Sequence, residues 1–144
     1  MTVWDLMEKT DRSPEEDDKM LHAAHASRYH WGEIGTPLEF ERGEWQISRV
    51  YALLQRPESA LYHAERCLAI CQTNNIGNFD LAFAYEGIAR AYAVAGDADQ
   101  SRTYIALGKQ ASQDIKEADD RQYCLRELQS VSELLAESWP SAQK

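Results

Sequence analysis

Histidines gather in residues 22–31, HAAHASRYHW, which hold three of the four in the chain. His22 and His25 are three residues apart, so on a helix they share one face. Imidazole is a zinc ligand, but zinc needs three or four ligands. Asp18 would lie on the same face, whereas His30 points elsewhere, and no HExxH motif completes a set. We therefore expect polar packing at a helix end, and keep a metal- or ligand-binding site built on His22 and His25 as the less favoured alternative.

The cysteines, Cys67, Cys71 and Cys124, are the other residues with metal-binding or nucleophilic chemistry. An odd number without a CxxC pair predicts neither a disulfide framework nor a zinc knuckle. Cys67 and Cys71 would be stacked neighbours on a helix, and we interpret all three as reduced core residues of a cytoplasmic protein. No phosphate loop and no nucleophile elbow is present. We expect a protein that is not an enzyme, with no catalytic residue, metal or cofactor.

The chain has 144 residues and a formal net charge of -9. This acidity argues against wholesale binding to nucleic acid or an anionic membrane, because clustered lysine and arginine supply the affinity for both. No apolar run approaches the length of a membrane span, and the N-terminus lacks the basic and apolar regions of a secretory signal. We therefore expect a single cytoplasmic domain without nucleic-acid or membrane partners.

Helix signals dominate the chain, and no alternating strand pattern stands out. Ser13-Pro14-Glu15-Glu16, for example, combines an N-cap serine, a proline at the first helical position and a glutamate three residues after the cap. The expected helices cover residues 14–31, 38–55, 58–73, 79–95, 98–116 and 119–137. Residues 1–12 are expected to form an N-terminal arm and residues 138–144 a C-terminal tail. The sequence thus predicts an all-α fold of about six helices with antiparallel neighbours.

An internal repeat relates residues 43–67 to residues 84–108. At an offset of 41 residues, Ile47 falls on Ile88, Arg49 on Arg90, Tyr51 on Tyr92 and Ala52 on Ala93. Both segments then reach a tight turn and a second helix. Two successive helix pairs with equivalent positions predict a stack of helical hairpins.

The pattern resembles the tetratricopeptide repeat (TPR) family, whose repeat of about 34 residues forms two antiparallel helices. In the first copy the pattern falls on Glu44, Ile47, Ser48, Tyr51, Ala60, Ala64 and Cys67, and in the second on Tyr85, Ile88, Ala89, Tyr92, Ser101, Ile105 and Gly108. Glu44 departs from the usual tryptophan, and both copies lack the closing proline. The longer period is similar to that of kinesin light chain repeats, with about one extra turn on each helix.

The resemblance implies a right-handed TPR-like superhelix that occupies residues 13–137 as one domain. Within it we expect a half repeat at 13–35, full repeats at 38–75 and 79–117, and a capping helix at 119–137. This is the equivalent of three repeats, about the minimum that buries a continuous core.

The resemblance also implies a concave face lined by the first helix of each pair. The positions that point there are Arg42, Trp45, Arg49, Phe83, Glu86, Arg90, Tyr123 and Arg126. Because arginine binds carboxylates bidentately and aromatic rings supply flat apolar contacts, we expect a groove for a protein or peptide with acidic or carboxylate groups. The alternative is that these arginines pair with acidic residues of the chain itself. The lysine and asparagine pattern of chaperone-binding members is absent.

The repeat gives the histidine segment a second interpretation. His22, His63 and Tyr104 are successive equivalents at an offset of 41, so His22 is expected in a half-buried ring position. His25, Tyr29 and Trp31 would stand at the open N-terminal end, where no preceding repeat covers them. They could form an end interface, so the alternative function is a homo-oligomer, such as a homodimer, that associates through its terminal helices.

Overall fold

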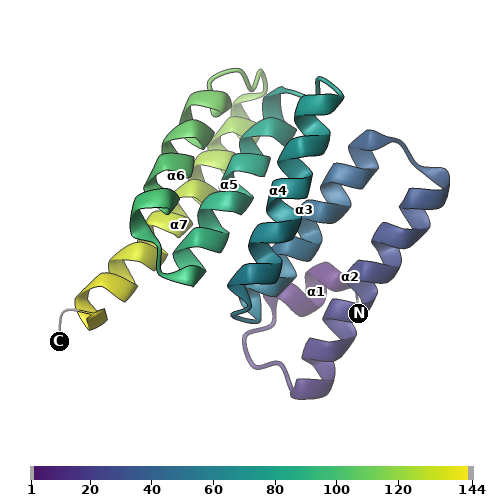
Figure 1. Cartoon of the computed structure of the whole chain (residues 1–144), viewed down its shortest axis with the longest axis horizontal. Helices are drawn as coiled ribbons and strands as arrows, with labels where there is room; N and C mark the ends of the chain where they lie inside the picture. The colour runs from purple at the N-terminus through teal and green to yellow at the C-terminus, as the bar shows by residue number, and fades with distance from the viewer. Residues whose placement is uncertain (1, 143–144) are drawn as a thin grey trace.

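The computed structural model describes residues 2–142, with side chains only as far as residue 137 at the C-terminal end. Seven helices make up this part of the chain, and it contains no strand (Figure 1). The helices are α1 (Val3–Glu8), α2 (Pro14–Ile34), α3 (Pro37–Leu53), α4 (Pro57–Thr73), α5 (Asn78–Ala95), α6 (Ala98–Ser112) and α7 (Ala118–Ala142). The predicted all-α class is therefore confirmed, and α2 to α7 correspond to the six predicted helices.

Short turns reverse the chain between successive helices (Figure 1). The predicted capping box at Ser13 and Glu16 is present, with Pro14 at the first helical position of α2. Gly96 ends α5 in the left-handed conformation, with a φ of 83°, which glycine adopts at little cost. Helix ends are thus set locally by the residues that the sequence patterns single out.

Both predicted terminal segments contain helical structure. Within the N-terminal arm, Thr2 and Asp5 form a capping box that starts α1, and Leu6 is buried against α2 and α3. Arg12 donates to the Leu6 and Lys9 carbonyl oxygens and so satisfies groups at the end of α1. At the other end, α7 continues to Ala142, so most of the predicted tail at 138–144 is helical, and residues 143 and 144 lie outside the described residues.

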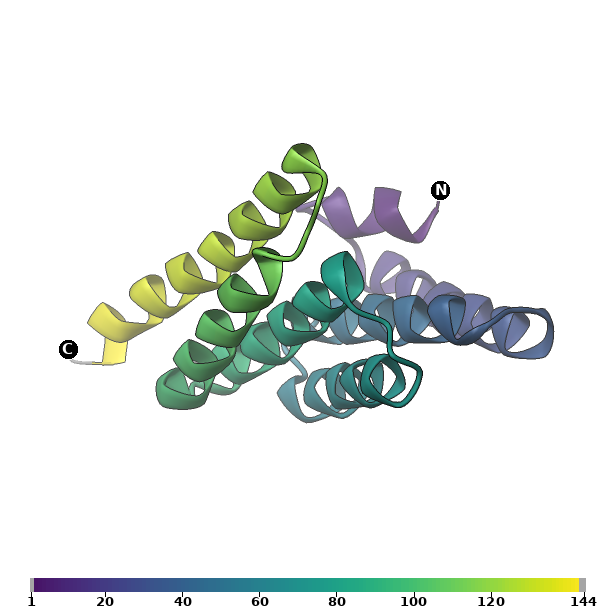
Figure 2. The same cartoon turned by 90° about the horizontal axis from the view of Figure 1, so that it is seen from above.

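Each helix packs against its neighbours in sequence, and α5 also packs against both α3 and α7. Viewed from above, α1 and the start of α7 lie on one side of α3 and α5, and α4 lies on the other (Figure 2). The surface formed by α1, α3, α5 and α7 is called the α3–α5–α7 face below. None of the described helices is long and apolar enough to cross a membrane.

Positions related by the 41-residue offset make equivalent contacts. The Tyr51 ring stacks on His63 with centroids 5.6 Å apart, and Tyr92 stacks on Tyr104 at 5.8 Å. A serine hydroxyl joins the helices of each pair: Ser48 donates to the Ala60 carbonyl oxygen at 2.7 Å, and Ser101 donates to that of Ala89 at 2.8 Å. Ser48 is equivalent to Ala89, and Ala60 is equivalent to Ser101. The same pair of positions is therefore hydrogen-bonded in both copies, but the serine is on the first helix in one copy and on the second helix in the other.

The structure corrects the expectation for His22, which is exposed rather than half-buried. Its equivalents His63 and Tyr104 stack on tyrosines of the preceding helix. The position 41 residues before Tyr51 is Thr10, which lies between α1 and α2 and has no ring to offer. The first half repeat therefore lacks the partner that buries this position in the later copies.

Candidate functional site

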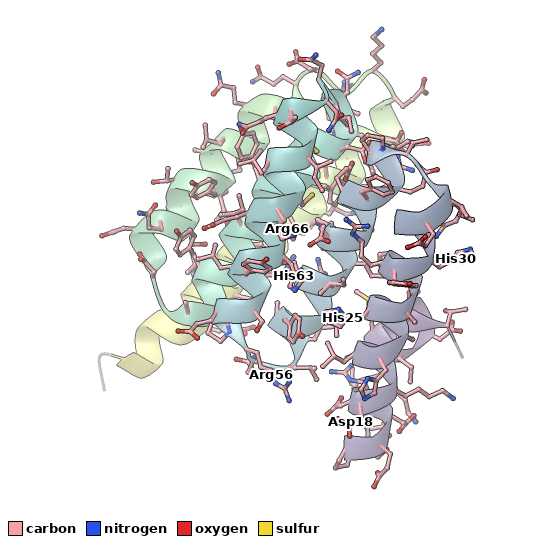
Figure 3. The ribbon with its side chains drawn as sticks, turned by 45° about the vertical axis from the view of Figure 1, so that its right-hand side comes forward. Asp18, His25, His30, Arg56, His63 and Arg66 are labelled. Atoms are coloured by element: carbon pink, nitrogen blue, oxygen red, sulfur yellow. The ribbon has the colours of Figure 1, made fainter. Side chains whose placement is uncertain are left out.

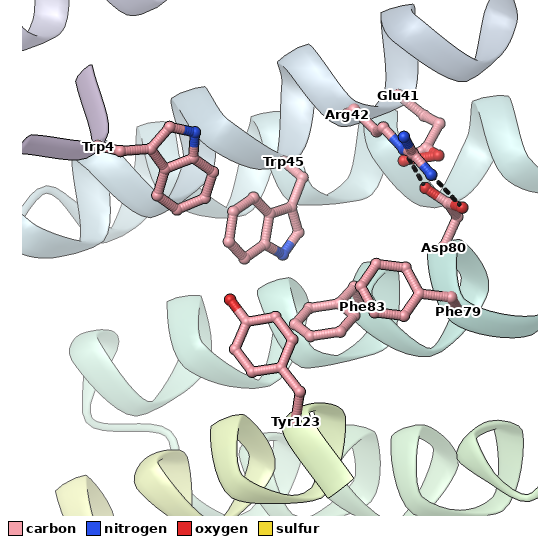
Figure 4. Close-up of a pocket in the computed structure, with 8 residues that line it drawn as sticks. All are labelled: Trp4, Glu41, Arg42, Trp45, Phe79, Asp80, Phe83 and Tyr123. Carbon is pink, nitrogen blue, oxygen red and sulfur yellow. Dashed lines mark hydrogen bonds and ion pairs between the residues drawn. The ribbon is translucent and has the colours of Figure 1, made fainter. Parts of the chain in front are cut away.

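A cavity of about 270 Å³ opens on the α3–α5–α7 face where four helices converge (Figure 4). Its walls combine aromatic rings with charged groups at one end. The lining residues are Trp4 from α1, Glu41, Arg42 and Trp45 from α3, Phe79, Asp80 and Phe83 from α5, and Tyr123 from α7. We call this cavity the aromatic pocket.

Five aromatic rings form one connected cluster around the aromatic pocket, with Phe83 in contact with three of the others. Ring centroids are 5.8 Å apart for Trp4 and Trp45, 5.8 Å for Trp45 and Phe83, 4.6 Å for Phe83 and Phe79, and 5.3 Å for Phe83 and Tyr123. Phe83 is buried at the base, whereas Trp4 and Tyr123 stand at the rim with 47% and 37% of their surface exposed. The rim rings are thus exposed to an incoming group, and the ring at the base is packed against its neighbours.

Charged side chains at one end of the pocket are paired or buried. The Arg42 guanidinium donates to both carboxylate oxygens of Asp80, at 2.8 and 3.1 Å. Glu41 is only 2% exposed, and its Oε2 has no hydrogen-bond partner among the described residues. Burial raises the pKa of Glu41 to about 9, and the Asp80 carboxylate adds to the effect by accepting the Glu41 proton in a hydrogen bond and by charge repulsion, so this side chain is neutral near pH 7.

The predicted arginines of the groove are engaged by acidic residues of the chain itself. Glu86, which is fully buried, accepts from Arg90 Nε at 2.8 Å, from Arg49 Nη1 at 3.3 Å and from Trp45 Nε1 at 3.0 Å. Arg49 and Arg90 also reach the Glu127 carboxylate, at 3.1 and 3.3 Å. Two guanidinium groups and two carboxylates therefore balance one another, as in the alternative that the sequence left open.

Of the eight predicted groove residues, the structure brings Arg42, Trp45, Phe83 and Tyr123 together in the aromatic pocket. Arg49, Glu86 and Arg90 form the ion-pair network beside it. Arg126 is exposed on α7 and makes no ion pair with any residue that the structure describes.

Four lining residues escaped the sequence analysis: Trp4, Glu41, Phe79 and Asp80. The Thr2-to-Asp5 capping box was the available signal for a helix that carries Trp4. Phe79 stands four residues before Phe83, a spacing that places both rings on one helix face.

A second polar cluster joins α2, α3 and α4 around Glu44, on a different side of α3 (Figure 3). The buried Glu44 carboxylate accepts from Arg28 at 2.7 Å and Arg66 at 3.2 Å, and lies 2.8 Å from His63 Nδ1. Burial opposes its ionisation, but His63 and the arginines outweigh burial and hold the pKa of Glu44 at about 2. We call this group the Glu44 cluster.

The predicted end-interface residues divide into two groups. His25 Nε2 lies 3.0 Å from the Tyr51 hydroxyl, and its ring meets that of His63 at 5.6 Å, so His25 borders the Glu44 cluster (Figure 3). Burial lowers the pKa of His25, and His63 adds to the effect. Tyr29 and Trp31 are 72% and 39% exposed on α2. They remain available for the interface that the sequence predicted.

His22 and His25 do not belong to any group of three close metal-ligand side chains among the described residues. Such a group is formed instead by Glu41, Cys67 and Cys71. The sequence analysis treated the two cysteines as core residues and overlooked the carboxylate, which comes from the neighbouring helix.

No known protein family matches this chain, and neither a curated protein nor a solved structure resembles it closely enough to count as a match.

Proposed function

We propose that this chain is a non-enzymatic, cytoplasmic protein- or peptide-binding module of TPR-like architecture. It would hold a short peptide on the α3–α5–α7 face by inserting one large apolar or aromatic side chain into the aromatic pocket. The observation that carries the proposal is the cavity of about 270 Å³ whose walls include five aromatic rings from four helices. Three free cysteines suit the reducing compartment that the proposal assumes.

The chemistry of the pocket favours an apolar anchor. Aromatic rings gain stability by burying area and by edge-to-face contacts with a further ring. Trp4 and Tyr123 at the rim are the kinds of residue that dominate the energetics of protein interfaces. A concave and mostly apolar site with a few polar groups at one end is also the usual form of a ligand pocket.

Charge around the pocket defines a secondary requirement for the partner. Arg42, Arg49 and Arg90 are paired internally, so a carboxylate of the partner would have to displace Asp80, Glu86 or Glu127 to reach them. Arg126 stands three residues after Tyr123 and is exposed, so it is the arginine best placed to meet an acidic group. We therefore propose a peptide with an apolar anchor and, beside it, at most one carboxylate bound by Arg126.

The test begins with selection of binders from a library of displayed random peptides on the wild-type chain. A synthetic copy of a selected peptide is then titrated while the fluorescence of the tryptophans is recorded, because two of the four, Trp4 and Trp45, contribute to the pocket. We expect selected peptides to share an aromatic or large aliphatic residue. Tyr123→Ala should weaken binding at least about tenfold, as for an interface hot spot.

The matched control is Tyr62→Ala, which removes a tyrosine that is 58% exposed on α4, away from the pocket. It should leave the affinity unchanged. Equal affinity of wild type and Tyr123→Ala would contradict the proposal, as would failure of the library to yield any binder.

The alternative function is a homo-oligomer, and one observation favours it. Tyr29 and Ile34 are 72% and 66% exposed on α2, with Trp31 between them at 39%. Large apolar side chains grouped at the end of a helical stack are a typical association surface. Light scattering at two protein concentrations tests this alternative: a monomer at the higher concentration contradicts it, and a dimer that Tyr29→Ser with Ile34→Ser dissociates supports it.

A further inference from the structure

Two cysteines and a glutamate come together in the interior between α3 and α4. Cys67 and Cys71 lie one turn apart on α4, and Glu41 projects from α3. Their two sulfur atoms and one carboxylate oxygen all lie within 4.8 Å of one another. The Cys67 Sγ is 3.8 Å from Glu41 Oε1. We call this group the Glu41–cysteine cluster.

These separations are close to those of a zinc site. Zinc binds sulfur at about 2.3 Å and carboxylate oxygen at about 2.0–2.2 Å in a tetrahedron, so its ligand atoms are roughly 3.3–3.8 Å apart. Cys67 and Glu41 already meet this spacing at 3.8 Å. The third ligand atom lies at most 4.8 Å from the other two, so a movement of roughly 1 Å would complete the spacing.

A second and independent feature points to a ligand. Glu41 is 2% exposed and its Oε2 atom accepts no hydrogen bond from any described residue; the neutral carboxyl group can only share its own proton with the Asp80 carboxylate. A buried polar atom without a partner is costly, and native proteins supply nearly all such atoms with one. A cation held between Glu41 and the two sulfur atoms would supply it.

Two cavities border the cluster, whose three side chains are at most 2% exposed. Glu41 forms part of the wall of the aromatic pocket, and Cys71 lines a second open cavity of about 330 Å³ beside the turn between α4 and α5. A metal ion would enter through the thin wall between one of these cavities and the cluster, since a buried site requires an entry path. The side facing the aromatic pocket would leave a fourth coordination position open to water.

We propose that Glu41, Cys67 and Cys71 form a zinc site that links α3 to α4. Two thiolates and one carboxylate select a borderline-soft divalent cation over magnesium or calcium, which prefer oxygen alone. On binding, each thiol and the neutral Glu41 carboxyl group release their protons to solvent, and the two sulfur atoms and one carboxylate oxygen donate electron pairs to the metal, without any change of oxidation state. The site shares Glu41 with the aromatic pocket, but neither cysteine lines that pocket, so substitutions of the cysteines test metal binding separately from peptide binding.

The first test is titration of the reduced, metal-free full chain with Co²⁺, which reports on coordination by its absorption. We expect one ion per chain, a sulfur-to-metal charge-transfer band and the visible bands of tetrahedral cobalt, all abolished by added Zn²⁺. Cys67→Ser and Cys71→Ser should remove the charge-transfer band or reduce the affinity more than a hundredfold, and Glu41→Gln at least tenfold. Circular dichroism establishes that each variant is folded.

The matched control is Cys124→Ser, which replaces the third buried cysteine, in α7. It should bind Co²⁺ as the wild type does. Absence of a charge-transfer band in the wild type would overturn the proposal, and so would a loss of affinity in Cys124→Ser as large as that in Cys67→Ser.

A second test needs no variant, so it stands even if substitutions in the core prevent folding. The wild-type chain is alkylated in mild urea with and without Zn²⁺, and the modified cysteines are identified by mass spectrometry. We expect Zn²⁺ to slow alkylation of Cys67 and Cys71 at least tenfold more than that of Cys124. Equal protection of all three would mean that Zn²⁺ acts elsewhere and would overturn the proposal.

Discussion

Glu41 and Glu44 lie three residues apart on α3 and are equally buried, at 2% and 3% exposure, yet their surroundings are opposite. Glu44 is surrounded by Arg28, His63 and Arg66, and its pKa is about 2. Glu41 faces the cysteines and Asp80, and its pKa is raised by burial to about 9. One helix therefore carries two buried carboxyl groups in different states. Glu44 is charged and faces α2 and α4, and Glu41 is neutral and faces α4 and α5.

The difference shows that burial alone does not decide what a carboxyl group does. A buried charge is stable only when hydrogen bonds and opposite charges replace its hydration. Glu44 has these partners and holds three helices together. Glu41 has no cationic partner that outweighs its burial, only the Cys67 thiol at 3.8 Å and the Asp80 carboxylate, so it stays neutral.

The largest expected effects come from replacing each of the two carboxyl groups in turn. Glu44→Gln leaves three cationic or polar partners facing a neutral amide, so we expect a loss of about 3 kcal/mol in the free energy of unfolding. Glu41→Gln should change stability little at about pH 4, where the carboxyl group is neutral in both states. At pH 7 it should stabilise the chain by on the order of 3 kcal/mol, because only the wild type must take up a proton at this position to fold. Urea denaturation followed by circular dichroism, with a chelator present, measures both.

Equal losses in the two variants would contradict the comparison, because they would mean that both carboxylates are equally well paired. A Glu41→Gln variant more stable than wild type is consistent with it, since the substitution removes a group that resists ionisation.

The pH dependence should have opposite signs at the two positions. The pKa of Glu41 is about 9 in the folded chain against an ordinary value of 4.5, so folding takes up a proton between these values and stability falls as pH rises. The pKa of Glu44 is about 2 against an ordinary 4.5, so its contribution is complete above pH 4.5 and is lost as pH falls toward 2.

We therefore expect metal-free wild type to lose on the order of 2 kcal/mol relative to Glu41→Gln between about pH 7 and pH 9. In acid, the stability difference between wild type and Glu44→Gln should shrink as pH falls below 4.5. Urea denaturation at a series of pH values, with each variant compared with wild type, gives both curves. A flat difference curve for Glu41→Gln would show that its pKa is not raised.

The sequence predicts the framework of the molecule better than the chemistry of its interior. Capping residues at Ser13 and Gly96 predict helix ends, and the 41-residue offset predicts which positions are equivalent; the structure adds that the equivalent rings stack in equivalent pairs. These signals are local or repetitive, so they can be read along one chain. TPR-like superhelical geometry remains a prediction.

The partners of the buried charges could not be predicted in the same way. Arg49 pairs with Glu86 and Glu127, which are 37 and 78 residues away in sequence, and periodicity cannot show which of several acidic residues meets an arginine. Substituting glutamate for Arg49 and Arg90 as a test of ligand binding would accordingly place like charges against buried Glu86 and disturb the fold. The aromatic pocket offers rim residues for a cleaner test.

The smallest expected effects compare two arginines within the Glu44 cluster. Arg28 Nε lies 2.7 Å from Glu44 and its side chain is 20% exposed, whereas Arg66 lies at 3.2 Å and is 47% exposed. Because solvent screens exposed ion pairs, we expect Arg28→Gln to cost about 1–2 kcal/mol and Arg66→Gln less than about 0.5 kcal/mol. Urea denaturation at low and high salt separates them: salt should reduce the Arg66→Gln effect to zero and leave most of the Arg28→Gln effect. Equal costs of the two substitutions would contradict the comparison. They would mean that the total positive charge around Glu44, rather than the distance and burial of each arginine, keeps its pKa low.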